Sequence, residues 1–344
     1  MAPRRGGGSS YSGSNSYGSS SSNACSSVAF ATKEAQVVIA FHALFFLVFI
    51  ALFGIAGFKL LRSKRKGTAL RRWFAFGFSI AFMIISVVLS IVGFTLIQCS
   101  IVSIRGYQLI NIPTSWFGLV GNFLLIALIM IPLCKRLVQG NSKIAKMVTI
   151  VNSLYIALLA VVLLCALATY TRVVDAPYSG RYRTSDLFLA VHQKRLRTAY
   201  SVLAIIGMLM AAANMLFALA RGRHLRKGVL LVAIPLLIVS SLGMTILDLA
   251  SHIIVDYLQE EYIAKGIDTF NQSLEAQMFL SYFFYATAFL MALIVASSPQ
   301  LADNGTTVPV THFQQQPKYP GTLSVQQPYQ QGAYQPQPQT QQRY

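Results

Sequence analysis

The sequence predicts an all-α, polytopic membrane protein, a seven-transmembrane helix bundle with disordered N- and C-terminal tails. Three observations predict this fold class. Hydrophobic residues make up 55% of the 344-residue chain and charged residues only 11%, whereas about a quarter of the residues in a soluble domain are charged. Seven apolar runs are each long enough to cross a bilayer. Lys and Arg gather in the short connections between alternate runs, which is a signal of membrane topology.

The apolar runs define the expected bundle. They cover residues 35–58, 73–98, 115–134, 147–170, 198–220, 228–255 and 276–298. We therefore expect a transmembrane bundle over residues 34–298. Residues 1–33 before it are rich in Ser and Gly, and residues 299–344 after it are rich in Gln, Pro and Tyr. Both ends lack the apolar content that a core needs, so both are predicted to be disordered.

The basic residues predict the orientation of the bundle. The connections at 59–72, 135–146 and 221–227 are short and basic, and such loops stay in the cytosol. We therefore expect the N-terminal head outside, the C-terminal tail in the cytosol, and the plasma membrane as the location. One basic run on the outer side, at 194–197, does not follow this rule. We expect it to lie at the surface within a short amphipathic helix over residues 185–197.

The sixth apolar run carries a polar stripe. Ser241, Thr245, Asp248 and His252 follow one another at spacings of four, three and four residues, which places them on one face of a helix. A carboxylate near the bilayer centre costs about 2.5–3.5 kcal/mol on insertion scales, so it faces protein or water and marks a candidate site. The stripe therefore predicts a face turned toward the interior of the bundle.

Three polar residues of other runs fall at a similar expected depth, namely His42, Asn122 and Tyr282. Together with Asp248 and His252, they define a hypothetical outward-facing polar pocket for a small or lipid-derived ligand. The alternative is that these residues make separate hydrogen bonds between helices, each worth about 0.6 kcal/mol.

Enzyme motifs are missing from the sequence. Zinc with an open coordination position needs at least three protein ligands, and zinc-dependent seven-span hydrolases use three histidines. The chain has five histidines but no HxxxH or HExxH pattern, and it has no nucleophile elbow or aspartyl pair. We therefore predict no enzyme activity, no metal and no cofactor. Topology accounts for the net charge of +18, so no nucleic-acid partner is expected.

Four residues are candidates for covalent modification. Cys25 and Cys99 both fall on the expected outer side, where an oxidising environment allows a disulfide; two free thiols are the alternative. Asn271 begins an outer Asn-Gln-Ser glycosylation sequon. Cys134 is a palmitoylation candidate because it lies beside basic residues at the inner end of the third run; a buried thiol is the alternative.

The third run ends in LCKRLVQ and the seventh reads SYFFYATAFLMALIVASSP. The seven-span plan with an outer N-terminus resembles G-protein-coupled receptors and the receptor-like seven-transmembrane proteins of fungi. The likeness is one of architecture, because these two runs carry no DRY-type triplet, no NPxxY pattern and no lysine for retinal. The resemblance implies a receptor-like protein of the cell surface.

The leading hypothesis is therefore a receptor-like sensor. Its expected partners are the lipid bilayer, a small-molecule or lipid ligand, and a cytosolic partner for the C-terminal tail. One alternative is a transporter or lipid-translocating protein, although the sequence shows no inverted repeat or pair of broken helices. Another alternative is a membrane-organising scaffold without a ligand.

Overall fold

The computed structural model describes Cys25 and residues 30–62, 67–137, 142–177, 184–221 and 228–298. Seven helices in these segments are long and apolar enough to cross a bilayer, and the chain is an integral, multi-pass membrane protein. The predicted disorder of the head and of the tail at 299–344 falls outside the described residues, as do the central residues of the basic connections. Only Cys25 and residues 30–33 of the head are described.

The helices follow the predicted runs and extend beyond several of them. In chain order they are α1 (Lys33–Arg62), α2 (Gly67–Gln98), α3 (Ile104–Leu128), the π-helical turn η1 (Ile129–Leu133), α4 (Cys134–Leu137), α5 (Ser142–Asp175), α6 (Thr184–Arg221), α7 (Leu230–Asp256), α8 (Gln259–Lys265) and α9 (Ile267–Ser297). The prediction of a separate surface helix over residues 185–197 is wrong. This segment forms the first turns of α6, and two of its basic residues, Lys194 and Arg197, contact α7.

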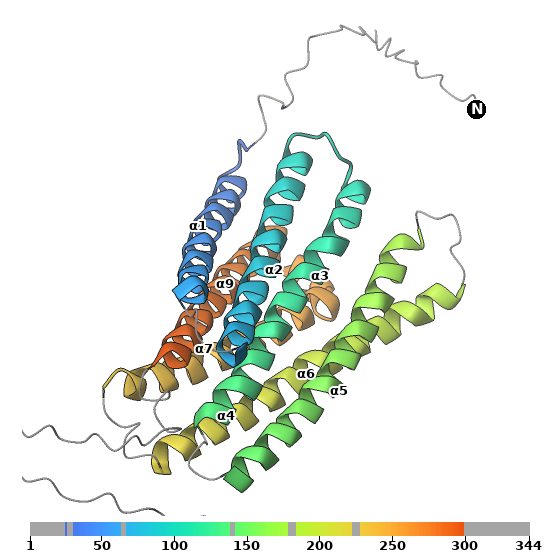
Figure 1. Cartoon of the computed structure of the whole chain (residues 1–344). Helices are drawn as coiled ribbons and strands as arrows, with labels where there is room; N and C mark the ends of the chain where they lie inside the picture. Colours follow the sequence, from blue (N-terminus) through green and yellow to red (C-terminus); the bar gives the residue numbers. More distant parts are fainter. Residues whose placement is uncertain are drawn as a thin grey trace, which may run out of the picture. The chain divides into compact units, whose positions relative to one another are not determined.

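The long helices close into a ring. Each packs against the next along the chain, with α3 against α5 and α7 against α9, and α9 returns to pack against α1 (Figure 1). Cys25 and Cys99 form a disulfide at the end of the ring where α2 ends and α3 begins. We call this end the disulfide end. Because successive helices alternate in direction, α5 and α7 also end there, and α6 and α9 begin there.

Small residues let neighbouring helices approach closely. A Cβ atom on Gly118 of α3 would lie 3.0 Å from Ser86 Oγ of α2, and one on Gly121 would lie 2.9 Å from Met83 Cγ. The Ser79 hydroxyl also donates to the Gly121 carbonyl oxygen at 2.9 Å. In lipid the hydrophobic effect does not drive helices together, because the lipid tails are as apolar as the side chains. Close packing of the helix backbones drives their association instead. The α2–α3 pair is therefore a firm wall of the bundle.

The half of the bundle away from the disulfide end is filled with large apolar side chains. Its fully buried members include Phe76, Ile80, Leu125, Ile129, Met130, Met208, Leu237 and Phe289. The outer surface is also apolar, with Leu154 73% and Val232 67% exposed. An apolar surface of this extent suits contact with lipid, whereas a soluble monomer exposes smaller apolar patches.

The turn η1 shows how α5 supports a break in its neighbour. Pro132 has no N–H, so the Leu128 carbonyl loses its α-helical partner, and the Cys134 N–H bonds to the Ile129 carbonyl in a π-type turn. The Met130 carbonyl oxygen instead accepts a hydrogen bond from Asn152 Nδ2 of α5 at 2.6 Å. A neighbouring side chain thus satisfies a backbone group that lipid cannot satisfy.

Replacing Asn152 with Leu is expected to lower the stability of the protein by about 1–3 kcal/mol, because the buried Met130 carbonyl loses its donor. Thermal unfolding of the purified protein in detergent measures the effect. Val151→Leu on the exposed side of α5 is the matched control. Equal unfolding midpoints for the two variants would contradict this role of Asn152.

The Cys25–Cys99 disulfide predicts a simple gel result. If a specific protease site is inserted within residues 63–66, cleavage gives two fragments that migrate together without reductant and separate with it. The two fragments of the cleaved Cys99→Ser variant should separate both with and without reductant. Separation of the cleaved parent protein without reductant would show that the two cysteines are not bonded.

Candidate functional site

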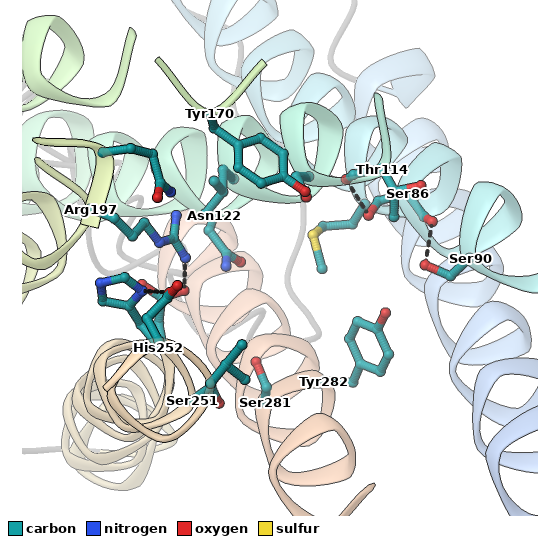
Figure 2. A pocket seen from close by; sticks show the side chains of 18 residues that line it. Ser86, Ser90, Thr114, Asn122, Tyr170, Arg197, Ser251, His252, Ser281 and Tyr282 are labelled. Atoms are coloured by element: carbon teal, nitrogen blue, oxygen red, sulfur yellow. Dashed lines mark hydrogen bonds and ion pairs between the residues drawn. The ribbon is translucent and has the colours of Figure 1, made fainter. Parts of the chain in front are cut away.

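A cavity of about 400 Å³ lies within the ring, toward the disulfide end. Side chains from α2, α3, α5, α6, α7 and α9 line it (Figure 2). Hydroxyl groups are frequent in this lining and come from Ser86, Ser90, Thr114, Ser115, Tyr170, Ser251, Ser281 and Tyr282. The volume falls in the range of about 300–1,000 Å³ that small-molecule sites occupy. The cavity is therefore large enough for a small ligand with polar groups.

The structure brings together four of the five residues predicted to form a pocket. Asn122, Asp248, His252 and Tyr282 all line this cavity. They come from α3, α7 and α9, which are far apart in the sequence. These four residues were predicted to lie at a similar depth in the membrane, and the cavity lies at that depth along the bundle axis.

His42 does not line the cavity, so its inclusion in the predicted pocket was wrong. Its side chain is buried, its Nδ1–H donates to the Val38 carbonyl oxygen at 2.9 Å, and its ring faces the Tyr282 ring with 6.0 Å between centroids. The described lining includes no residue of α1. The expected depth of His42 could not show which side chains at that level reach the cavity, and there Tyr282 lines it while His42 packs against the Tyr282 ring.

An ion pair joins α6 to α7 at the edge of the cavity. Arg197 Nη2 donates to Asp248 Oδ1 at 2.5 Å, and the two side chains are only 16% and 20% exposed. The other carboxylate oxygen accepts a hydrogen bond from the Ser201 hydroxyl at 2.7 Å. The sequence predicts a surface helix for Arg197 and does not indicate this partner. Both oxygens of Asp248 are thus already bonded within the protein.

A second pair lies one helical turn closer to the disulfide end. His252 Nδ1 lies 2.6 Å from Asp256 Oδ2. Its Nε2 lies 3.0 Å from Thr198 Oγ1 and 3.2 Å from the Lys194 carbonyl oxygen, and the Thr198 hydroxyl donates its hydrogen to that same carbonyl. Both ring nitrogens of His252 therefore lie within hydrogen-bond distance of partners on α6 or α7.

The register of α6 and α7 was the signal that could have revealed these contacts. Two helices joined by a short connection pack antiparallel, so each turn forward on α6 matches a turn backward on α7. Ser201, Thr198 and Lys194 then fall opposite Asp248, His252 and Asp256 in turn. The polar spacing on α7 is visible in its own sequence, whereas the basic residues of the matching segment of α6 appear in the sequence only as an exception to the topology rule.

Three buried polar atoms at the cavity have no partner among the described residues. They are Asn122 Oδ1, Arg197 Nη1 and the Tyr200 hydroxyl. A smaller cavity of about 10 Å³ shares Asn122 and Asp248 with the large one and reaches Tyr200. A buried polar group without a partner costs about 1–3 kcal/mol, and such groups in native proteins call for an explanation such as water or a ligand.

The remaining predicted sites differ in their surroundings. Cys134 is 1% exposed and its Sγ faces the Ala211 carbonyl oxygen at 3.9 Å, so the thiol is enclosed and does not fit the predicted palmitoylation. Asn271 is exposed near the start of α9, and its glycosylation stays a prediction. Within the described segments, no three His, Cys, Asp or Glu side chains are grouped so that they could hold a metal ion.

Comparison of the chain with family models, with curated proteins and with solved structures gives no match. The geometry and chemistry of the cavity are therefore the basis for the function proposed below.

The Arg197–Asp248 pair predicts a strong coupling between two substitutions. Asp248→Leu alone leaves a largely buried guanidinium without its counter-charge and should cost about 3–5 kcal/mol of stability. The double variant Arg197→Met with Asp248→Leu should unfold close to the parent temperature, because no uncompensated charge remains. Thermal unfolding of the parent, both single variants and the double variant measures the coupling. Additive effects would contradict a direct pair.

Proposed function

We propose that this protein is a receptor-like sensor of the plasma membrane that binds a small or lipid-derived ligand in the cavity, with the disulfide end facing outside. The observation that carries the proposal is the cavity of about 400 Å³ together with its unpartnered Asn122 Oδ1 and Arg197 Nη1 atoms. Polar groups that only held helices together would be expected to find partners in neighbouring helices. These two atoms instead lack a partner on the wall of a space that fits a ligand.

The packing beyond the cavity supports sensing more than transport. A transporter needs a route past its binding site to the opposite face. Between the cavity and the end of the bundle away from the disulfide, fully buried side chains such as Leu125, Ile129 and Met130 fill the interior. A ligand bound in the cavity would therefore act on the helices around it without passing between them.

Helix α9 offers a path from the cavity to the opposite end. Ser281 and Tyr282 of α9 line the cavity, and the Arg136 guanidinium of α4 donates to the Ala296 carbonyl oxygen near the end of α9 at 2.9 Å. The C-terminal tail follows directly after this helix. A ligand that shifts α9 would thus also affect the Arg136 contact and the start of the tail, where the orientation proposed here places the cytosol.

A blocked cavity tests the proposal. Ser281→Trp should fill the cavity, whereas Leu280→Trp places the same ring at the neighbouring position, which is 39% exposed. A panel of small polar and lipid-derived compounds is screened for a rise in the unfolding temperature of the purified protein. Compounds that stabilise the parent and Leu280→Trp should fail to stabilise Ser281→Trp. The proposal fails if no compound stabilises the parent, or if stabilising compounds act equally on all three proteins.

The same compounds separate a sensor from a transporter. Proteoliposomes loaded with a stabilising compound should release it no faster than protein-free liposomes. Faster release that Ser281→Trp abolishes would favour a transporter and contradict the sensing proposal.

A further inference from the structure

The charges that line the cavity restrict the ligands it can accept. Two basic and two acidic side chains face the cavity. They form two pairs, Arg197 with Asp248 and His252 with Asp256. Asp248 has both carboxylate oxygens bonded, one to Arg197 and one to Ser201. The Asp256 carboxylate is likewise held against a partner within the protein, His252 Nδ1, at 2.6 Å. A charged ligand would find no free counter-charge in this lining.

The wall formed by α2 and α3 offers hydrogen-bond acceptors. The hydroxyls of Ser86, Ser90 and Thr114 each donate to a backbone carbonyl oxygen, at 3.0, 3.0 and 2.9 Å. A hydroxyl has one hydrogen, so once it is donated only lone pairs remain for a ligand. Asn122 Oδ1 on α3 is an acceptor without a partner among the described residues. These three hydroxyls and Asn122 Oδ1 therefore call for donors on the ligand.

The opposite wall offers a donor. Figure 2 shows Arg197 and His252 on the other side of the cavity from Ser86, Ser90 and Thr114. While Arg197 Nη2 is bonded to Asp248, Nη1 of the same guanidinium has no partner in the described part of the chain. A ligand therefore needs to accept a hydrogen bond here and to donate hydrogen bonds at the wall formed by α2 and α3.

We propose that the cavity selects an uncharged ligand that carries hydroxyl groups, which donate to Asn122 Oδ1 and the α2–α3 hydroxyls and accept from Arg197 Nη1. This inference rests on the proposed function and names its ligand class. A carboxylate or phosphate would place further lone pairs against a wall of acceptors. A protonated amine would find acceptors, but it would be buried without a free carboxylate, which is costly. Hydroxyl groups meet both walls without adding charge.

Thiol-specific reagents that differ in charge test the selection. Ser281→Cys places a thiol in the cavity, and Gln272→Cys places one at an exposed position of the same helix. The full-length protein in detergent is treated with hydroxyethyl, sulfonatoethyl or trimethylammonium-ethyl methanethiosulfonate, which are neutral, anionic and cationic. Mass spectrometry of the peptide with the introduced thiol gives each rate. Ser251→Cys on α7 is a second cavity position in case Ser281→Cys does not fold.

The expected result is a preference for the neutral hydroxyl-bearing reagent. After division by the rates at Gln272→Cys, it should modify the cavity thiol about tenfold faster than either charged reagent. Adding Asp248→Asn leaves the Arg197 charge unbalanced, so the relative rate of the anionic reagent should rise about tenfold. Adding Arg197→Gln should raise the relative rate of the cationic reagent instead.

Different failures have different meanings. If a charged reagent reacts as fast as the neutral one in the cavity, the inference about an uncharged ligand is overturned, while the cavity and the proposed function stand. If no reagent modifies either cavity thiol although all modify Gln272→Cys, the cavity does not admit small molecules. That outcome overturns both the inference and the proposed function.

Discussion

The ion pair between Arg197 and Asp248 is the interaction on which the candidate site depends. Charges within a membrane bundle are expensive unless they are paired and hydrogen-bonded, and here the Ser201 hydroxyl completes the shell of the carboxylate. The pair fixes α6 beside α7 at the level of the cavity. It also leaves Arg197 Nη1 as a donor without a partner among the described residues. The same guanidinium thus balances the charge of Asp248 and supplies the donor that we propose for ligand recognition.

Around this pair, the bundle divides into a hollow polar half and a solid apolar half. The close contact of α2 with α3 at Gly118 and Gly121 gives the cavity a firm wall of hydroxyl acceptors. Large apolar side chains such as Phe76, Ile129 and Phe289 are fully buried in the opposite half. Helix α9 spans both halves, from Ser281 and Tyr282 at the cavity to the Arg136 contact at Ala296, and this arrangement supports the proposed sensor.

Sequence reasoning succeeded where the bilayer imposes the answer. Spans follow from length and hydropathy because backbone groups in lipid must bond within helices, and helical periodicity placed Asp248 and His252 on an inward face. It failed where the answer depends on how helices are rotated and registered. His42 has the right depth but stands behind Tyr282. The partners of Arg197 and Lys194 require the register of α6 on α7, and the Asn152 contact depends on the altered backbone around Pro132.

A high-resolution structure of the full-length protein, extracted with native lipids and held in a nanodisc, tests the central claim most directly. The account predicts Arg197 paired with Asp248 and density for an additional uncharged molecule between Asn122 and the guanidinium. A cavity filled by the protein's own side chains, with Arg197 turned outward to lipid headgroups, would contradict it.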